Sequence, residues 1–569
     1  MLFSSADFAA SETEIPFGDL KIGTFENHFQ QAYFWIEKKF RKNAQKIEEL
    51  VQLLEDKLAI PPKKKSVYKV QSKHLGVWCV TVDVHPDIKR PKEFMIEFDE
   101  FLDPLIWSGY MSDNSDFQPG PGDRKPAWLD LLNGQTSGDN QKRNADRDPA
   151  NKRHKRAPGG PDKKSTISKA KVGPGDELSR ADVVPVRSFS EDIILSQPPD
   201  VTLREMNQLA YRESDAGSGV VAYVVDSGLD LSHKHFENHR NQFFSESSLN
   251  WLYAGPLPND EKNDDGRPFK GFGDDEPNHK PMLHYTGTIT ASKIIGATGL
   301  APSADLVVVK SHTGRNFVGL INDIDCYLKI YDHFTLLNEL DKDKELNFKG
   351  GVIIAASGTD LHNLKTSLAD AYIGLYVDIL FHLGTLNIYT FYSNLSGKEK
   401  GTRFPRNGLI HAKFPTGKVH KSGLLKKISI VGSTDERKGG IREEKDIPPT
   451  RLYAPGITAA PWLFDHYRGN EGKLSYIPQL TSRYASALAA GVCAAMISRG
   501  WEDPLKRMEE LSYQRTVNKN APKVIWNGIK KSTWKKALKN HDIIGDTTGR
   551  NEAKEQNEGE NKGKNKADE

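Results

Sequence analysis

The 569-residue sequence has few cysteines, no long apolar run and no strong charge imbalance, and each shortage excludes a class of protein. Its three cysteines, Cys79, Cys326 and Cys493, are too few and too widely spaced for a disulfide framework or a cysteine-based metal site. No stretch of about 18 apolar residues occurs, so the sequence predicts no transmembrane helix and no membrane partner. The net charge of +3 is too small for the whole molecule to bind nucleic acid through its charge alone.

The first residues, Met1-Leu-Phe-Ser-Ser-Ala-Asp-Phe8, have neither a basic flank nor an apolar run of about seven residues. They therefore predict no standard signal peptide, although a leader trimmed from the sequence or a misassigned start would leave the same pattern. The sequence fixes neither the compartment nor the oligomeric state.

Residues 15–112 predict a small α+β module. Apolar residues at helical spacing predict a helix within 24–58, and Pro61-Pro62 ends it. Further along, the pattern predicts strands at 66–70, 77–84 and 105–110 and a second helix at 91–102.

The composition of two segments predicts disorder. One is a basic linker at 113–184, and the other is a tail at 546–569 that has no valine, isoleucine, leucine, methionine or aromatic residue. Residues 141–171 carry eleven Lys and Arg against three Asp and include the cluster Lys152-Arg-His-Lys-Arg156. Three interpretations of this cluster stay open: a solvated charge run, a site for a processing protease, or a patch for nuclear import or nucleic acid. The first is favoured, and nucleic-acid binding is the least favoured.

Between residues 185 and 545 apolar strands alternate with helical segments. The predicted strands are 220–225, 306–309, 352–355, 386–391 and 428–431, and the predicted helices are 287–294, 317–340, 367–383 and 484–499. This alternation predicts the α/β class, with a parallel sheet and helices on both of its faces.

The most informative stretch is the run Gly219-Val-Val-Ala-Tyr-Val-Val-Asp-Ser-Gly-Leu229, in which a buried parallel strand ends at Asp226. The carboxyl ends of parallel strands form the edge where ligands and catalytic groups gather in α/β sheets. A carboxylate there needs partners, because an unpaired buried charge is costly. The partners of Asp226 should therefore define the functional site.

Six segments that follow Asp226 in the chain resemble, in this order, motifs of the subtilisin-like serine peptidases, and they are most similar to the fungal branch of that family. They are residues 286–296, 299–310, 392–397, 431–435, 452–456 and 481–491. The resemblance covers residues from about 188 to about 530. It implies a subtilisin-like parallel sheet and a catalytic triad of Asp, His and Ser, in which the imidazole takes the proton of the serine and the carboxylate orients the imidazole.

Two triad members are missing when the family motifs are matched residue by residue. Asp226 matches the acid in Asp-Ser-Gly. The motif His-Gly-Thr-x-Val-Ala-Ser matches Thr286-Gly-Thr-Ile-Thr-Ala-Ser292, which puts Thr286 at the histidine. The motif Gly-Thr-Ser-x-Ala matches Thr481-Ser-Arg-Tyr-Ala485, which puts Arg483 at the serine.

A shift of register could supply both groups from neighbours, since His284 precedes Thr286 by two residues and Ser482 precedes Arg483 by one. One residue of a helix is about 100° of rotation, which catalytic geometry does not tolerate. The alternatives are that His284 is a loop residue near the site and that Ser482 is a helix N-cap.

Asn394 matches the family's oxyanion-hole asparagine, although the adjacent family glycine is Ser393 here; the alternative is an asparagine in a turn at the end of a strand. We further predict that Arg483 pairs with Asp226 in the volume that the missing histidine leaves, against the alternative that it points into solvent.

The sequence thus predicts a subtilisin-like pseudopeptidase that binds a peptide or protein at its former active site. The resemblance implies that residues 15–112 are a propeptide-like module, and the alternative is an unrelated α+β cap. One alternative is an active serine endopeptidase that uses His284 and Ser482. A second alternative is association with nucleic acid or the nucleus through the basic linker. No cofactor is predicted; the resemblance implies secretion and allows calcium, but no set of calcium ligands stands out.

Overall fold

The computed structural model describes two groups of residues. The first comprises 30–36, 38–58, 67–84, 106–111 and 118–119; the second comprises 183–187, 191–206, 209–226, 228–229, 235–236, 251–255, 286–311, 319–341, 348–355, 366–393, 426–435, 440–441, 450–461, 476–480, 482–515 and 521–543. The predicted helix at 91–102, the cluster 152–156, almost all of the predicted linker and the whole of the predicted tail lie outside the described residues.

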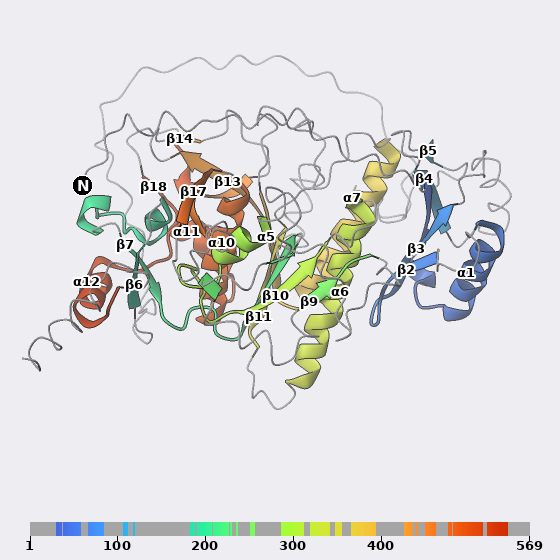
Figure 1. Ribbon diagram of the computed structural model, residues 1–569, viewed down its shortest axis with the longest axis horizontal. Helices are drawn as coiled ribbons and strands as arrows, with labels where there is room; N and C mark the ends of the chain where they lie inside the picture. Colours follow the sequence, from blue (N-terminus) through green and yellow to red (C-terminus); the bar gives the residue numbers. More distant parts are fainter. Residues whose placement is uncertain are drawn as a thin grey trace, which may run out of the picture.

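An eight-stranded sheet forms the centre of the larger domain (Figure 1). Seven of its strands run parallel, in the spatial order β9 (Trp251–Tyr253), β10 (Asp305–Lys310), β8 (Val220–Asp226), β11 (Gly350–Ala355), β12 (Ile388–Ser393), β13 (Ile428–Asp435) and β15 (Thr450–Pro455). The short β14 (Gly440–Ile441) pairs antiparallel with β13. β8 therefore lies inside the sheet, between β10 and β11.

Helices cover both faces of this sheet, which confirms the predicted α/β class. On one face α6 (Gly319–Leu340) and α7 (Thr366–Thr385) pack against Val221, Tyr223 and Val225 of β8. On the other face α5 (Thr286–Ser292), α10 (Ser482–Ser498) and α11 (Pro504–Leu511) share a core with the alternate residues of the same strand. β8 is buried on both faces, which explains why its sequence is continuously apolar.

In its described residues the N-terminal module is a five-stranded antiparallel sheet with one α-helix. Its order is β2 (Val67–Ser72), β3 (Gly76–Val84), β1 (Gln30–Ile36), β4 (Ile106–Met111) and β5 (Gln118–Pro119), and α1 (Ala44–Leu58) follows β1 and the short 3-10 helix η2 (Lys38–Phe40). The module lies on the far side of α6 and α7 from the large sheet (Figure 1).

The helix predicted within 24–58 is correct only for its second half. Residues 30–36 form the middle strand of the module sheet instead of a helical turn. Phe34 and Ile36 pack on α1 whereas Trp35 packs against α6 and α7, so both faces of the strand are buried. A short apolar run that is buried on both sides cannot be distinguished from a helix by its periodicity.

The first and last described elements of the larger domain pack together on the side of that domain away from the N-terminal module. β6 (Val183–Arg187) pairs with β7 (Leu209–Glu213), and α12 (Lys531–Asn540) packs on them through Trp534, whose ring lies 5.4 Å from that of Tyr211. The remaining described elements are the 3-10 helices η3 (Glu191–Ser196) and η4 (Leu203–Met206) and the hairpins β16 (Ile457–Pro461) with β17 (Tyr476–Leu480) and β18 (Tyr513–Gln514) with β19 (Lys523–Val524). Within the described ranges, no helix has the length and apolar character to cross a membrane.

Candidate functional site

Asp226 is the last residue of β8 and lies at the carboxyl edge of the parallel sheet. The strand is buried up to Val225, and Asp226 itself is half-buried. The backbone N–H and the hydroxyl of Ser311 both donate to the carbonyl oxygen of Asp226, at 2.9 and 3.2 Å, and so tie the end of β8 to the end of β10. Asp226 thus lies at the carboxyl edge of the sheet, as its place directly after a buried parallel strand predicted.

The amino end of α5 lies directly against this acid. A Cβ atom on Gly287, the second residue of the helix, would lie 1.9 Å from the carbonyl oxygen of Gly228 and 3.3 Å from the Cβ of Asp226. Only glycine allows this approach. The backbone of Thr286, which begins α5, is therefore next to the acid, at the place where the resemblance puts a histidine.

The start of α10 lies at the same edge of the sheet. At the other end of the helix, the Ser498 hydroxyl accepts from the Gly217 N–H at 3.0 Å and the Ser498 carbonyl accepts from Lys349 Nζ at 2.6 Å. Gly217 precedes β8 and Lys349 precedes β11, so the helix ends at the amino edge of the sheet. Its 17 residues span about 25 Å, which brings its first turn, with Ser482 and the half-buried Arg483, to the carboxyl edge.

β12 brings a fourth motif to this edge. Its last residue, Ser393, is buried and lies in register with Val431 of β13. Asn394 follows it directly but, like His284, lies outside the described residues. The structure therefore gathers Asp226, Thr286, Arg483 and Ser393 at one edge, while the catalytic roles of these positions stay predictions.

Arg212, which the sequence analysis did not single out, holds the loop that joins α5 to β10. Its guanidinium is buried and donates to the carbonyl oxygens of Gly296 at 3.2 Å, of Ala297 at 3.3 Å and of Gly299. A planar group with several fixed donors suits such a set of carbonyls. No short-range pattern in the sequence reveals this role, because Arg212 lies more than 80 residues before the loop.

Asp323, whose carboxyl group has a raised pKa, is another residue that the sequence did not indicate. Asp323 lies in the first turns of α6, which follows β10 and so begins near the carboxyl edge. Burial raises the pKa of Asp323 to about 7, against the effect of a hydrogen bond that it accepts from the Tyr376 hydroxyl at 2.6 Å. Its carboxyl group therefore titrates near neutral pH.

We expect Asp323→Asn to remove part of the pH dependence of folding. An acid with a raised pKa binds more protons in the folded than in the unfolded state, so its contribution to stability is lost as the pH rises from the unfolded pKa of about 4 to the folded pKa of about 7. Asparagine keeps an acceptor for Tyr376 and cannot ionise. In urea unfolding over this range, the free energy of unfolding of the wild type should fall more steeply than that of the variant, by about 1.4 kcal/mol per pH unit. Equal slopes would contradict the assignment.

The predicted pair between Arg483 and Asp226 can be measured by a double-mutant cycle. With Arg483→Gln and Asp226→Asn, a charge-assisted bond should give a coupling energy of about 1–3 kcal/mol in denaturant unfolding. The control pair is Arg507 and Glu510, an i,i+3 pair at 3.2 Å on α11 whose carboxylate is exposed, and its coupling should stay below about 0.5 kcal/mol. A coupling at the edge no larger than that of the control would show that Arg483 points elsewhere.

No cluster of three or more His, Cys, Asp or Glu side chains suited to a metal ion occurs in the part of the chain that the structure describes.

Comparison with known proteins gives structural neighbours only. No protein-family model and no curated protein matches the sequence. Among solved structures, the chain is similar to a cold adapted subtilisin-like serine proteinase (14% identity, 59% of this chain and 96% of the other, TM-score 0.34). It is also similar to the S41 psychrophilic protease (15%, 52% and 84%, 0.33) and to the MycP3 protease of the type VII (ESX-3) secretion system (14%, 61% and 91%, 0.33). At these TM-scores the neighbours add nothing to the chemistry of the site, which rests on its own residues.

Proposed function

We propose that this chain is a member of the subtilisin-like serine endopeptidase family that has lost catalysis and binds a peptide or protein at its former active site. The observation that supports this most directly is the contact between α5 and Asp226. The helix begins with Thr286 beside the acid, and threonine has no ring nitrogen to take a proton from a nucleophile.

The change at the position of the nucleophile also removes a catalytic group. Arg483 takes the position of the nucleophile in the first turn of α10, and a guanidinium is always protonated and cannot attack a carbonyl carbon. In this type of site the loss of one triad member lowers turnover by roughly 10⁴ to 10⁶, and the loss of two leaves only binding and oxyanion stabilisation. Asn394 is the residue that would still serve that stabilisation.

We assign the N-terminal module to the same origin as the propeptides of such peptidases. Its sheet covers α6 and α7 of the larger domain, and α1 packs on the other face of that sheet, away from the carboxyl edge residues described above. Under this proposal the module supports the fold, and ligand binding takes place at Asp226, Arg483 and their neighbours.

Two assays on the full-length protein test the loss of catalysis. A fluorophosphonate probe, which labels activated serines, should leave the chain unlabelled, and a denatured protein substrate should be hydrolysed no faster than by an Asp226→Ala control. Labelling at Ser482 that disappears in an Asp226→Ala variant would contradict the proposal and favour a working peptidase with His284 as its base.

Binding needs a separate assay. A fluorescently labelled denatured protein should bind without being cleaved, and Arg483→Trp, which fills the edge with a large side chain, should weaken binding about tenfold. Lys506→Trp on the exposed side of α11 is the matched control. Binding that both variants leave unchanged would place the ligand elsewhere. Salt-sensitive DNA binding that is lost when residues 141–171 are deleted would favour the basic linker instead.

A further inference from the structure

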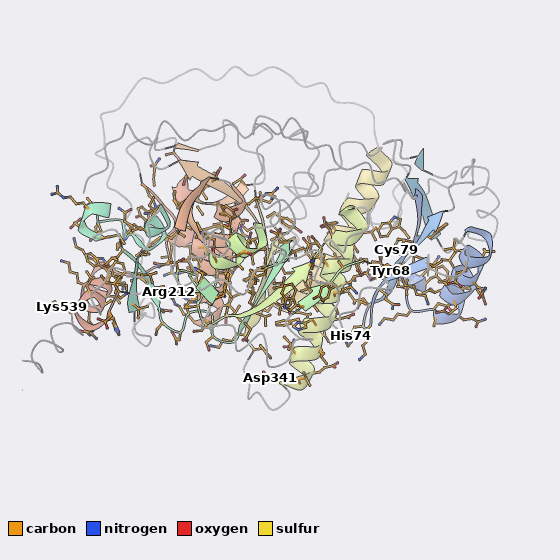
Figure 2. The ribbon with its side chains drawn as sticks, in the orientation of Figure 1. Tyr68, His74, Cys79, Arg212, Asp341 and Lys539 are labelled. Carbon is orange, nitrogen blue, oxygen red and sulfur yellow. The ribbon has the colours of Figure 1, made fainter. Side chains whose placement is uncertain are left out.

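The outer face of α12 is a surface of lysines that the proposed site does not use. Five lysines lie on this helix or at its N-cap: Lys530, Lys531, Lys535, Lys536 and Lys539. In the wider segment 516–541 the sequence has seven lysines and no aspartate or glutamate. Figure 2 shows Lys539 at the end of the molecule opposite the N-terminal module with Tyr68 and His74. The charge of the chain is therefore small as a whole but strongly positive at this helix.

Packing decides which side of α12 faces outward. Trp534 and Ala537 are both 3% exposed and share a core with Tyr211 of β7. On another side of the helix, three lysines four residues apart form a row with a rise of about 6 Å between neighbours: Lys531, Lys535 and Lys539. Lys531 is half-buried, whereas the other four lysines are exposed. Their ammonium groups can therefore meet a partner without any change in the fold.

Among the described residues, only one of the five lysines has an acidic partner. Nζ of Lys531 lies 2.9 Å from a carboxylate oxygen of Glu205 on η4. Arg204, which precedes Glu205, is exposed and adds a further positive charge next to this pair. Within the described ranges the outer face of α12 thus carries four positive charges that no carboxylate of the chain compensates.

These lysines oppose the stability of the helix that carries them. The pairs Lys531 with Lys535 and Lys535 with Lys539 place like charges four residues apart, which destabilises a helix. The amino end of a helix favours acids, but α12 has none in its first turn. Its N-cap, Lys530, makes no side-chain capping hydrogen bond. The fold itself therefore gains nothing from this arrangement of charge.

α11, an amphipathic helix of eight residues in the same domain, has the stabilising features that α12 lacks. Its N-cap Asp503 accepts from the Lys506 N–H at 3.1 Å, and Arg507 pairs with Glu510 at 3.2 Å. Both helices bury one face, so they differ in the charges that they expose. Local choices that lower stability without a gain in packing are typical of a functional surface.

The chemistry of this face suits the phosphate backbone of a double-stranded nucleic acid. Lysine binds phosphate as a point charge, without the planar geometry by which arginine recognises specific groups. Trp534, the aromatic residue of α12, is buried, so it cannot stack on the bases of a single strand. The apolar side of α12 is occupied by its core with Tyr211, whereas a helix that binds an anionic membrane inserts that side.

We propose that the outer face of α12 binds the phosphate backbone of duplex DNA without preference for sequence. Each lysine that neutralises a phosphate releases counterions, so the logarithm of the binding constant falls with the logarithm of the salt concentration by about 0.9 per contact. The four exposed lysines should together contribute about 3 to 4 to this slope. The inference is independent of the catalytic state of the chain and of the cluster at 152–156.

The test measures binding of a fluorescent duplex by the full-length protein between about 50 and 200 mM salt. The α12 variant combines Lys530→Gln, Lys535→Gln, Lys536→Gln and Lys539→Gln. It should bind at least about tenfold more weakly at the lowest salt concentration, with a slope that is less steep by about 3 to 4. Glutamine has a helix propensity close to that of lysine and relieves the repulsion, so the melting temperature should not fall.

The matched control removes the same charge from exposed lysines on other parts of the chain, by Lys42→Gln, Lys73→Gln, Lys426→Gln and Lys506→Gln. It should keep the slope of the starting protein, and deletion of residues 141–171 should leave the difference between the two variants in place. Absence of duplex binding at low salt, or equal weakening by both variants, would overturn the proposal. Tighter binding of a single strand of equal length, or of phosphatidylserine vesicles in place of the duplex, would contradict the assigned partner.

Discussion

Thr286→His combined with Arg483→Ser should give the protein a fluorophosphonate reactivity that neither single variant has. The structure provides the reason, since α5 begins against Asp226 and the first turn of α10 lies at the same edge of the sheet. An imidazole at position 286 would have the acid beside it, and a hydroxyl at position 483 would stand in the family's nucleophile position. Because triad members act as a unit, each single variant should regain little.

The expected gain is at least about 100-fold in labelling rate over the starting protein, out of the roughly 10⁶ that a complete triad supplies. It is measured by probe labelling followed by mass spectrometry, which must locate the label on residue 483. Adding Asp226→Ala to the double variant is the control and should abolish the gain. If the double variant folds with an unchanged melting temperature and is not labelled, the motif alignment at these two positions is wrong.

Gly287→Ala should be among the most destabilising single substitutions in the chain. The added methyl group would lie 1.9 Å from the carbonyl oxygen of Gly228, which is far shorter than a van der Waals contact. This oxygen belongs to the backbone, so the clash cannot be relieved by a change of side-chain rotamer. α5 would have to move away from β8, which would disturb the packing of Ala291 and Ile294 in the core below. We expect a loss of about 3 kcal/mol or more in the free energy of unfolding, or failure to fold.

Gly384→Ala is the matched control. Gly384 also lies in a helix, near the end of α7, but among the described residues outside its own helix backbone the only atom within 4 Å of its added Cβ would be Cδ of Lys427, at 3.9 Å. There the greater helix propensity of alanine should leave stability unchanged or raise it by up to about 1 kcal/mol. Denaturant unfolding of both variants measures the contrast. A Gly287→Ala protein as stable as Gly384→Ala would show that α5 does not approach Asp226 as described.

The strands and helices of the larger domain were largely predictable. The five strands and four helices expected between 220 and 499 all occur, among them β8 at 220–226 and α10 at 482–498. The short strands β9, β14 and β15 were missed, because they have two to six residues and little apolar pattern of their own. The intrinsic β propensity of such segments is weak, and they form strands because a longer neighbouring strand offers them hydrogen bonds.

The position of the candidate site at the carboxyl edge of the sheet was also predictable from the sequence. A carboxylate after a buried parallel strand must lie at the carboxyl edge, and glycine in the first turn of a helix allows that helix to approach it closely. Asp226 and Gly287 satisfy both conditions in the sequence alone. The pKa of Asp323 was not predictable, since it depends on burial under α7 and on Tyr376, 53 residues away.

Local sequence therefore determined which segments of the larger domain are strands and helices and where its acid lies, because apolar periodicity and strand ends are properties of neighbouring residues. The fold alone decided that residues 30–36 are a strand and how the N-terminal module is held. The module's contacts join residues 257 to 340 positions apart, such as Tyr68 to Asp325 and Lys38 to Asp378. No local pattern carries such pairings, which exist only once both surfaces have formed and excluded water between them.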